Sequence, residues 1–435
     1  PPGEYIGVRS AGVGAGRASR NHMDLFKELH WRGMVYDATE GTEDMLAKER
    51  VTCYIGFDPT ASSLHVGSLL PIMALARLQR HGHSPIALVG GGTGMIGDPS
   101  GKSQERTLLS IEEIDANARG MKAQLERFLD FAATPNAARM MNNADWLRTV
   151  GLLEFLRDTG KHFSVSVMMS KESVKRRLES GISFTEFSYQ LLQAHDFLHL
   201  HRVAGCTLQM GGSDQWGNIV AGCDLIRKVE GGKAHGLVLP LVTTSAGTKF
   251  GKTEAGTVWL DAARTSERDF YQFWFNTDDR DVIKYLKFFT WLSQDDIATL
   301  EAAMQSDPAA RSPQRRLAEE VTRAVHGEGA LSSVQHDAAL RFGGAATAES
   351  LQQVAAVASI ARERMTSGIA ATELVLLAGL AKSKSEAFRL IEQGGVSIND
   401  VALTDPRGMV FIEQALGDRF KVSRGKRGVA VVEIA

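Results

Sequence analysis

The chain contains two consecutive segments in which an apolar strand runs into a loop of small residues, and this arrangement limits the folds open to it. Residues 51–57 (VTCYIGF) have strand composition, and the loop 58–68 leads into an apolar pattern at helical spacing over residues 69–78. Residues 84–89 (SPIALV) form a second apolar strand, which is followed by the glycine-rich loop 90–101. Two such units in succession predict a parallel sheet with right-handed crossovers. Ligands of these sheets bind beyond the carboxyl ends of the strands, so both loops should line one crevice.

The first loop contains His65 and ends where a helix is expected to begin. Free backbone N–H groups and the positive end of the helix dipole attract phosphate at such a position. Many strand–loop–helix junctions carry one histidine without binding a ligand, so the loop alone leaves a structural role open.

Composition narrows the class of protein. The 435 residues are 43% hydrophobic, which suits about three globular domains. No run approaches the ~18 apolar residues of a membrane span, and residues 1–22 lack the apolar core of a signal peptide. The formal charge of -2 argues against a globally basic nucleic-acid binder but allows a local basic patch. Three scattered cysteines fit neither a disulfide framework nor a zinc site and indicate a reducing compartment.

A polar stripe marks the helix expected over residues 183–200 (SFTEFSYQLLQAHDFLHL). Tyr189, Gln193 and Asp196 stand at positions i, i+4 and i+7 and therefore share one face. A phenol, an amide and a carboxylate in line predict the polar wall of a binding site. A stripe that faces solvent would give the same pattern.

Two further loops follow strands. Residues 206–219 (CTLQMGGSDQWGNI) are expected to form a strand that ends in a double-glycine loop, and the strand expected over 237–242 leads into the loop 245–253. Lys249 and Lys252 in this last loop stand three residues apart between glycines, so both ammonium groups can point at a polyphosphate. Most loops of this kind are simply solvated.

The composition divides the chain into five ranges. Residues 1–22 are expected to be a flexible extension, 23–265 a nucleotide-binding α/β domain, and 266–342 a helical domain. Residues 343–371 are Ala-rich and are expected to be a linker that carries a helix. Residues 372–435 combine short helices with strands in a pattern typical of small RNA-binding domains. Residues 419–428 (RFKVSRGKRG) contain five basic residues and no acid, which suits a phosphate backbone, and a solvated tail would have the same composition. Helices are also expected over 23–39, 110–131 and 145–158.

These loops match one protein family in the same order along the chain. Residues 64–68 (LHVGS) are similar to the HIGH signature of class I tRNA synthetases, and residues 249–253 (KFGKT) to their KMSKS-type loop. The blocks GFDPTASSLHVG, GGGTGMIGDPSG, SFTEFSYQLLQAHDFL and LQMGGSDQWGNI match as well, and the last 60 or so residues look like an S4 RNA-binding domain. From Met23 to Ala435 the chain resembles bacterial-type tyrosyl-tRNA synthetases.

The resemblance implies a pocket for tyrosine, whose residues would be Tyr54, Asp98, Tyr189, Gln193, Asp196 and Gln209. Tyr54 and Asp196 would hydrogen-bond the phenolic hydroxyl of the substrate. Tyr189 and Gln193, together with Asp98, would hold its α-ammonium group. A site built around a buried hydroxyl should reject phenylalanine, because the polar groups of the site would lose their partner.

The resemblance also implies an ATP and adenylate site formed by Gly56, Asp58, His65, Gly67, Ser68, Gly212, Asp214, Gln215 and Lys252. The catalytic residues around the departing pyrophosphate would be Thr60, His65, Lys102, Arg106, Lys249, Lys252 and Thr253. Ser68 replaces the second histidine of the signature, which alters a ribose-side contact, and a serine at this position is expected to be able to cap the helix.

The implied activity is the activation of L-tyrosine with ATP, followed by transfer of the tyrosyl group to the 3′ end of tRNA(Tyr). The tyrosine carboxylate is itself the nucleophile, so catalysis should come from orientation and charge stabilisation. ATP is expected as a substrate with Mg²⁺, without a tightly bound cofactor or a dedicated metal site. We also expect a homodimer in the cytoplasm, with the mitochondrial matrix as the alternative, and no membrane partner.

Two other functions are compatible with parts of the sequence. A tryptophanyl enzyme would share the class I loops, but Tyr54 and the S4-like tail are typical of the tyrosyl branch. An RNA-binding relative without catalysis would keep the fold and the tail, and Ser68 is the one change in the signature that favours it. The presence of His65, Lys249 and Lys252 argues against this second alternative.

Overall fold

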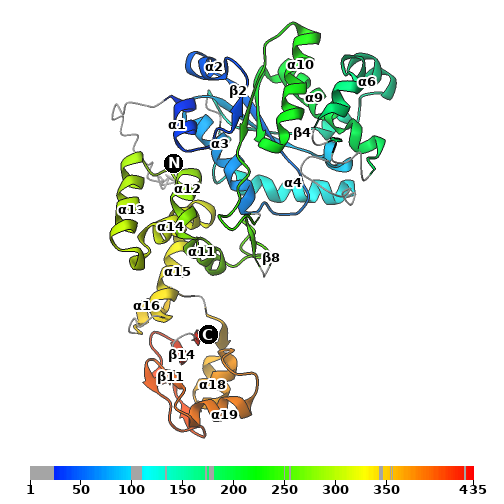
Figure 1. The fold of residues 1–435 in the computed structure, drawn as a ribbon. Helices are drawn as coiled ribbons and strands as arrows, with labels where there is room; N and C mark the ends of the chain where they lie inside the picture. Colours follow the sequence, from blue (N-terminus) through cyan, green and yellow to red (C-terminus); the bar gives the residue numbers. More distant parts are fainter. Residues whose placement is uncertain are drawn as a thin grey trace, which may run out of the picture.

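The chain forms three parts that follow one another along the length of the molecule (Figure 1). An α/β part, coloured blue to green, leads into a helical part in yellow-green and then into a C-terminal part in orange and red. The structure is a computed structural model that describes residues 24–98, 110–132, 135–171, 174–175, 181–248, 250–253, 256–341, 346–352, 354, 356–425 and 428–435. None of the helices in these ranges is both long enough and apolar enough to cross a membrane.

Among the described residues, a six-stranded sheet in the order β1-β6-β5-β2-β3-β4 forms the centre of the α/β part. Its strands are β1 (Asp37–Ala38), β2 (Thr52–Phe57), β3 (Ser84–Val89), β4 (Arg139–Asn142), β5 (Cys206–Gly212) and β6 (His235–Leu239). Neighbouring strands are parallel except β1, which is antiparallel to β6. The predicted parallel sheet is confirmed. Because the chain proceeds outward from β2 and from β5 in opposite directions, a ligand crevice is expected between the carboxyl ends of these two strands.

Helices cover both faces of this sheet. They are α1 (Leu25–Trp31), α2 (Thr42–Lys48), α3 (Leu69–Arg80), α4 (Ile111–Leu125), α5 (Ala144–Leu147), α6 (Leu152–Asp158), α7 (Val165–Ser170), α9 (Phe184–Ala204) and α10 (Trp216–Glu230). Successive side chains of a strand point to opposite faces. Cys53 and Ile55 of β2 accordingly belong to the core that contains α3, whereas Tyr54 belongs to the core that contains α9 and α10.

The helix expected over residues 23–39 is shorter in the structure. It ends at Trp31 because Gly33 adopts a φ of 72°, and the amide of Met34 donates to the carbonyl of Leu29 in a glycine turn. The chain then forms β1, which pairs with β6. The strand expected over residues 237–242 is also shifted, since β6 spans His235–Leu239.

The part expected to be helical consists of helices among its described residues. These are α11 (Glu267–Phe275), α12 (Asp279–Phe289), α13 (Gln294–Ser306), α14 (Ser312–His326) and α15 (Glu328–Arg341). A short hairpin of β7 (Lys252–Thr253) and β8 (Gly256–Thr257) precedes them. The fully buried Arg77 of α3 donates to the carbonyl of Thr290 at 2.6 Å, which joins this part to the α/β part.

The described C-terminal part is built around a five-stranded sheet in the order β12-β11-β14-β15-β9. Its elements are α16 (Ala348–Gln352), β9 (Ala358–Ile360), α17 (Arg362–Met365), β10 (Ile369–Ala370), α18 (Ala371–Leu377), α19 (Lys384–Glu392), β11 (Val396–Ile398), β12 (Val401–Ala402), β13 (Met409–Val410), β14 (Arg419–Arg424) and β15 (Gly428–Ile434).

This part begins earlier than the sequence suggested. Strand β9 pairs in parallel with β15, and the guanidinium of Arg419 donates to the carbonyls of Leu351 and Val354 at 2.7 and 2.6 Å. These contacts bind α16 and β9 to the C-terminal sheet. Both elements were expected within a linker and instead belong to the C-terminal unit.

Candidate active site

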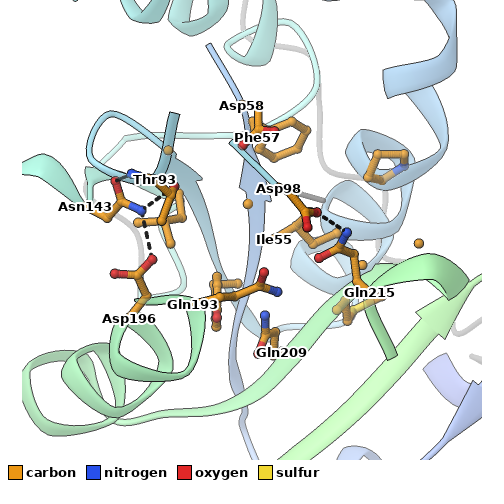
Figure 2. A pocket seen from close by; sticks show the side chains of 18 of the residues that line it. Ile55, Phe57, Asp58, Thr93, Asp98, Asn143, Gln193, Asp196, Gln209 and Gln215 are labelled. Carbon is orange, nitrogen blue, oxygen red and sulfur yellow. Dashed lines mark hydrogen bonds between the residues drawn. The ribbon is translucent and has the colours of Figure 1, made fainter. Parts of the chain in front are cut away.

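A pocket of about 210 Å³ lies between the carboxyl ends of β2 and β5 and the side of α9 (Figure 2). Its polar and glycine lining comprises Tyr54, Gly56, Asp58, Gly90, Thr93, Asp98, Asn143, Tyr189, Gln193, Asp196, Gln209, Gly211, Gly212 and Gln215. The lining includes all six residues that the sequence suggested for tyrosine. It also includes four of the nine suggested for ATP and adenylate, which are Gly56, Asp58, Gly212 and Gln215.

Helix α9 supplies one wall of the pocket. Tyr189, Gln193 and Asp196 all face the cavity, and Tyr189 and Asp196 are only 5% and 2% exposed. The alternative of a stripe that faces solvent is therefore wrong. Burial also raises the pKa of Tyr189 well above its usual value, so its phenol stays protonated and can donate a hydrogen bond.

The floor of the pocket comes from two neighbouring strands. Tyr54 of β2 and Gln209 of β5 are paired in the sheet register and are both buried. The hydroxyl of Tyr54 and the Oε1 atom of Gln209 have no hydrogen-bond partner among the described residues. Such buried groups are rare because each costs roughly 1–3 kcal/mol. They mark the floor as a place for a polar ligand group. A Cβ atom at Gly56 would meet nothing within 4 Å, so the space next to this floor is open.

Two residues that the sequence did not single out hold Asp196. Asn143 Nδ2 donates to Asp196 Oδ2 at 2.8 Å (Figure 2). Trp146 Nε1 donates to Asp196 Oδ1 at 2.7 Å. Asn143 also donates to Thr93 Oγ1 at 2.8 Å. Burial raises the pKa of Asp196 to about 7, although these two hydrogen bonds favour the ionised form. Asn143 directly follows β4, and its position at the end of a parallel strand is the signal that could have identified it.

On the opposite side of the pocket, where Asp98 and Gln215 lie, amide side chains form a hydrogen-bond network (Figure 2). Gln215 Nε2 donates to Asp98 Oδ2 at 2.6 Å. Asn218 of α10 donates to the Oε1 atoms of Gln215 and Gln193 at 3.2 and 3.1 Å. The carboxylates of Asp98 and Asp196 therefore stand at different sides of one cavity, with Gln193 between them.

Residues 58–68, which we call the histidine loop, lie next to this pocket. His65 Nδ1 accepts the backbone N–H of Gly67 at 3.0 Å and so caps the short 3₁₀ turn Val66–Ser68. A neutral imidazole in this arrangement carries its proton on Nε2 and can donate it to a ligand. The expectation that Ser68 caps the helix is wrong, since Ser68 already has helical backbone angles and makes no side-chain cap.

Residues 245–253, which we call the lysine loop, lie beside the histidine loop. The chain that leaves the lysine loop pairs with the histidine loop, because Val66 N donates to Val258 O and Leu260 N donates to Leu64 O at 3.0 and 2.9 Å. Gly251 has a φ of 82°, and a Cβ atom on it would come within 2.6 Å of Val66. The fold therefore brings together two loops that are almost 200 residues apart in the sequence.

The remaining predicted residues take different positions. Lys252 is exposed in the β7–β8 hairpin, and Thr253 is its neighbour in β7. Thr60 and Asp214 are exposed and do not line the pocket. Lys102, Arg106 and Lys249 lie outside the described residues. Within the described ranges, no group of three or more His, Cys, Asp or Glu side chains could hold a metal ion.

Comparisons with known proteins agree with this geometry. A family model described as tRNA synthetases class I (W and Y) matches residues 46–343, and a model of the S4 domain matches residues 374–410. The tyrosine–tRNA ligase of Roseiflexus castenholzii is 51% identical over 420 residues, which cover 94% of this chain and 99% of that protein. The tyrosine–tRNA ligase of Geobacillus stearothermophilus is 51% identical over 421 residues, which cover 95% and 100%.

A solved structure supports the same assignment. The C-terminally truncated mitochondrial tyrosyl-tRNA synthetase of Aspergillus nidulans is 32% identical, with a TM-score of 0.66, and the match covers 73% of this chain and 94% of that one. The class I fold, the helical part and the S4 domain expected from the sequence are thus confirmed. The chain belongs to the tyrosine–tRNA ligase family of class I tRNA synthetases.

Proposed function

We propose that this protein activates L-tyrosine with ATP and transfers the tyrosyl group to the 3′ end of tRNA(Tyr). The observation that carries the proposal is the buried floor of the pocket, where the hydroxyl of Tyr54 and the amide oxygen of Gln209 have no partner among the described residues. Asp196 lies close enough to add to the effect of burial in raising the pKa of Tyr54. A phenolic hydroxyl is the substrate group that can both accept from Tyr54 and donate to Asp196.

The other side of the pocket would bind the α-ammonium group of tyrosine. Tyr189, Gln193 and Asp98 would hold it, and the Gln215–Asp98 hydrogen bond supports a fixed position for the Asp98 carboxylate. The substrate carboxylate would then face the nucleotide side of the crevice. Because a carboxylate is already a competent nucleophile, orientation supplies much of the acceleration and no general base is required.

The adenylate would occupy the strand ends beyond this pocket. Gly56 and Gly212 would let the backbone approach it, and Asp58, Gln215, Gly67 and Ser68 would contact its ribose and phosphate. Asp214 is proposed for the same site, although its exposed side chain lies outside the cavity that the described residues enclose.

Charge develops on the departing pyrophosphate, and the two loops would stabilise it. His65 would donate from Nε2, and Thr60 and Lys252 would approach from the loop surfaces. Thr253, Lys249, Lys102 and Arg106 are proposed to complete this set on the strength of the family resemblance. Positioned cations and donors of this kind act through transition-state stabilisation. Mg²⁺ would arrive with ATP as part of the substrate.

Further partners follow from the rest of the chain. The S4 domain and the helical part would bind tRNA(Tyr). Apolar side chains are exposed on α6, α7 and the first turn of α9, including Leu152, Leu153 and Phe184 at 71%, 76% and 78%, and they support a homodimer formed through this surface. We propose the cytoplasm as the compartment, with the mitochondrial matrix as the alternative.

Two alternatives remain as outcomes of an experiment. A tryptophanyl enzyme belongs to the same family model, but its indole would offer no hydroxyl to Tyr54 and Asp196. An RNA-binding protein without catalysis would not need the buried polar floor.

Exchange of labelled pyrophosphate into ATP tests the proposal. We expect exchange that depends on tyrosine and is much faster than with tryptophan. Absence of exchange from pure, folded protein would contradict the proposed activity, and preference for tryptophan would contradict the proposed substrate.

A further inference from the structure

The lysine loop is attached to the helical part of the chain at two points, one before and one after its turn. These attachments involve α11 and α12, which do not line the tyrosine pocket. They offer a physical reason why a loop that carries catalytic lysines keeps one position next to the histidine loop.

Asp281 forms the first attachment. Its side chain is only 3% exposed, and its Oδ2 accepts the backbone N–H of Ser245 at 2.8 Å. Lys284 Nζ contacts Asp281 Oδ1 at 3.1 Å and donates to the carbonyl of Thr243 at 3.2 Å. The hydroxyl of Tyr285 donates to the same carbonyl at 3.3 Å. One face of α12 therefore holds the backbone from which the lysine loop starts.

Phe250 forms the second attachment. It is 6% exposed, and its ring packs against the rings of Tyr285, Phe289 and Trp274 with centroid distances of 4.9, 5.6 and 5.6 Å. Gly251 follows directly and lies against Val66 of the histidine loop. The buried ring of Phe250 thus anchors the backbone directly before Gly251 and Lys252.

Among the described residues, the loop between these two points borders a cavity on one side. A cavity of about 640 Å³ separates the described loop residues from α11, and Thr244, Ser245, Thr248 and Phe250 line one side of it. The side chains of residues 245–248 are exposed. The loop has its own turn, in which Gly247 N donates to Thr244 O at 2.9 Å, but a turn fixes its shape and not its direction. The direction must come from the attachments.

We propose that Asp281 is a positioning residue for the lysine loop, which it holds through the backbone N–H of Ser245 so that the loop lysines face the leaving group of ATP. This inference rests on the proposed function. Asp281 is not among the residues that line the tyrosine pocket. The contact between Asp281 and Ser245 connects the helical part, which would bind tRNA, directly to the loop that carries the proposed catalytic lysines.

The test uses the full chain and five variants, one of which, Asp281→Asn, is the conservative replacement that keeps a side-chain acceptor oxygen. Asp281→Ala removes the acceptor. Ser245→Pro removes the donor at the second position of a turn, where proline is favoured. The double variant combines both changes. Asp278→Ala is the control, because Asp278 caps the same helix through Arg280 N and has no contact with the loop backbone among those described.

We expect Asp281→Ala and Ser245→Pro each to lower kcat/KM for ATP about tenfold in pyrophosphate exchange, as for one hydrogen bond to a charged group. The KM for tyrosine should stay unchanged. The double variant should lose no more than either single variant, because both changes break the same bond. Asp281→Asn should recover part of the activity, and Asp278→Ala should destabilise the protein while it keeps wild-type kinetics.

Trypsin gives a readout that does not depend on activity. Cleavage after Lys249 or Lys252 in the folded protein should be faster in Asp281→Ala and Ser245→Pro than in the wild type and Asp278→Ala. Multiplicative losses in the double variant, or unchanged kinetics and cleavage in the single variants, would overturn the proposal. If Asp281→Ala does not fold, Ser245→Pro alone decides. A wild type without tyrosine-dependent exchange would contradict the proposed function instead, and the cleavage comparison would still test the attachment.

Discussion

The two ends of the crevice are built in different ways. At the proposed tyrosine end, Tyr54, Asp196 and Gln209 are buried and come from strands and a long helix, and Asp196 is held by hydrogen bonds from Asn143 and Trp146. At the proposed leaving-group end, Thr60 and Lys252 are exposed. The two loops are joined by backbone hydrogen bonds, and the lysine loop also has two attachments to the helical part.

This difference corresponds to two chemical tasks. Recognition of one amino acid needs polar atoms that cannot relax toward another ligand, which a buried and hydrogen-bonded pocket provides. Release of pyrophosphate needs charges that can come together around ATP and separate again, which loops provide. Changes at the tyrosine end should therefore alter the KM for tyrosine and specificity, whereas changes at the loop end should alter the rate of activation.

The largest effect is expected for Asp196→Ala. It would remove the proposed acceptor for the substrate hydroxyl, and it leaves the indole N–H of Trp146 and one of the two amide N–H groups of Asn143 without a partner. We expect kcat/KM for tyrosine to fall about 10³-fold, since a hydrogen bond to a charged group contributes about 1.5–3 kcal/mol and a buried donor left unpaired costs about 1–3 kcal/mol. Pyrophosphate exchange at varied tyrosine measures this. Asp158→Ala, which changes an exposed acid on α6, serves as control and should behave like the wild type.

A somewhat smaller and kinetically different effect is expected for Lys252→Ala. Loss of a charge that acts on the leaving group should lower kcat for adenylate formation about 10²-fold. The KM for tyrosine and the binding of tRNA should not change. Single-turnover measurement of tyrosyl-adenylate, with the exposed Lys48→Ala as control, separates these parameters. If Lys252→Ala instead raised the KM for tyrosine and left kcat unchanged, the proposed division of tasks between the two ends would be wrong.

Tyr54→Phe should give opposite effects on activity and stability. Loss of one neutral hydrogen bond to the substrate should lower kcat/KM for tyrosine about tenfold. The hydroxyl has no partner among the described residues of the unliganded protein, so its removal should raise the free energy of unfolding by about 1 kcal/mol. Urea denaturation without tyrosine measures the second effect. Lower stability would mean that the hydroxyl has a structural partner.

The smallest effect is a pH dependence from Asp196. Its pKa is raised from 3.8 to about 7, so between these values the folded protein holds a proton that the unfolded chain has lost. The contribution of Asp196 to stability therefore falls as pH rises through this window. Affinity for tyrosine should change in the other direction and weaken as pH falls below about 7, because the ionised carboxylate is the better acceptor. Equilibrium dialysis across this range, with Asp196→Asn for comparison, checks both the midpoint and its origin.

Local patterns were enough to predict most of the fold and the tyrosine wall. Tyr189, Gln193 and Asp196 could be placed together because helical spacing fixes their common face. Trp146 could not be predicted, because only the packing of α5 beside α9 brings it to Asp196, 50 residues away in sequence. Asn143 could have been proposed from its place directly after β4, but no motif singles it out.

Other differences also have local physical causes. Ser68 was expected to cap the helix that follows it. A 3₁₀ turn, Val66–Ser68, precedes this helix, and the side chain of His65 caps that turn instead. Helix α16 and strand β9 were expected within a linker. The pairing of β9 with β15 joins residues more than 70 positions apart, and no local pattern in the sequence shows such a pairing. The role that we propose for Asp281 could not be predicted, because its contact with Ser245 joins residues 36 positions apart.

The most direct test of the account is the ratio of kcat/KM values for tyrosine and phenylalanine in pyrophosphate exchange by the wild-type protein. Tyrosyl-tRNA synthetases are themselves the reference case for rejection of a substrate that lacks a hydroxyl, with a known discrimination of about 10⁵. The account predicts a ratio of this order, together with a sharply smaller ratio for Asp196→Ala. A wild-type ratio below about 10², the level that shape alone provides, would contradict recognition through the buried hydroxyl site.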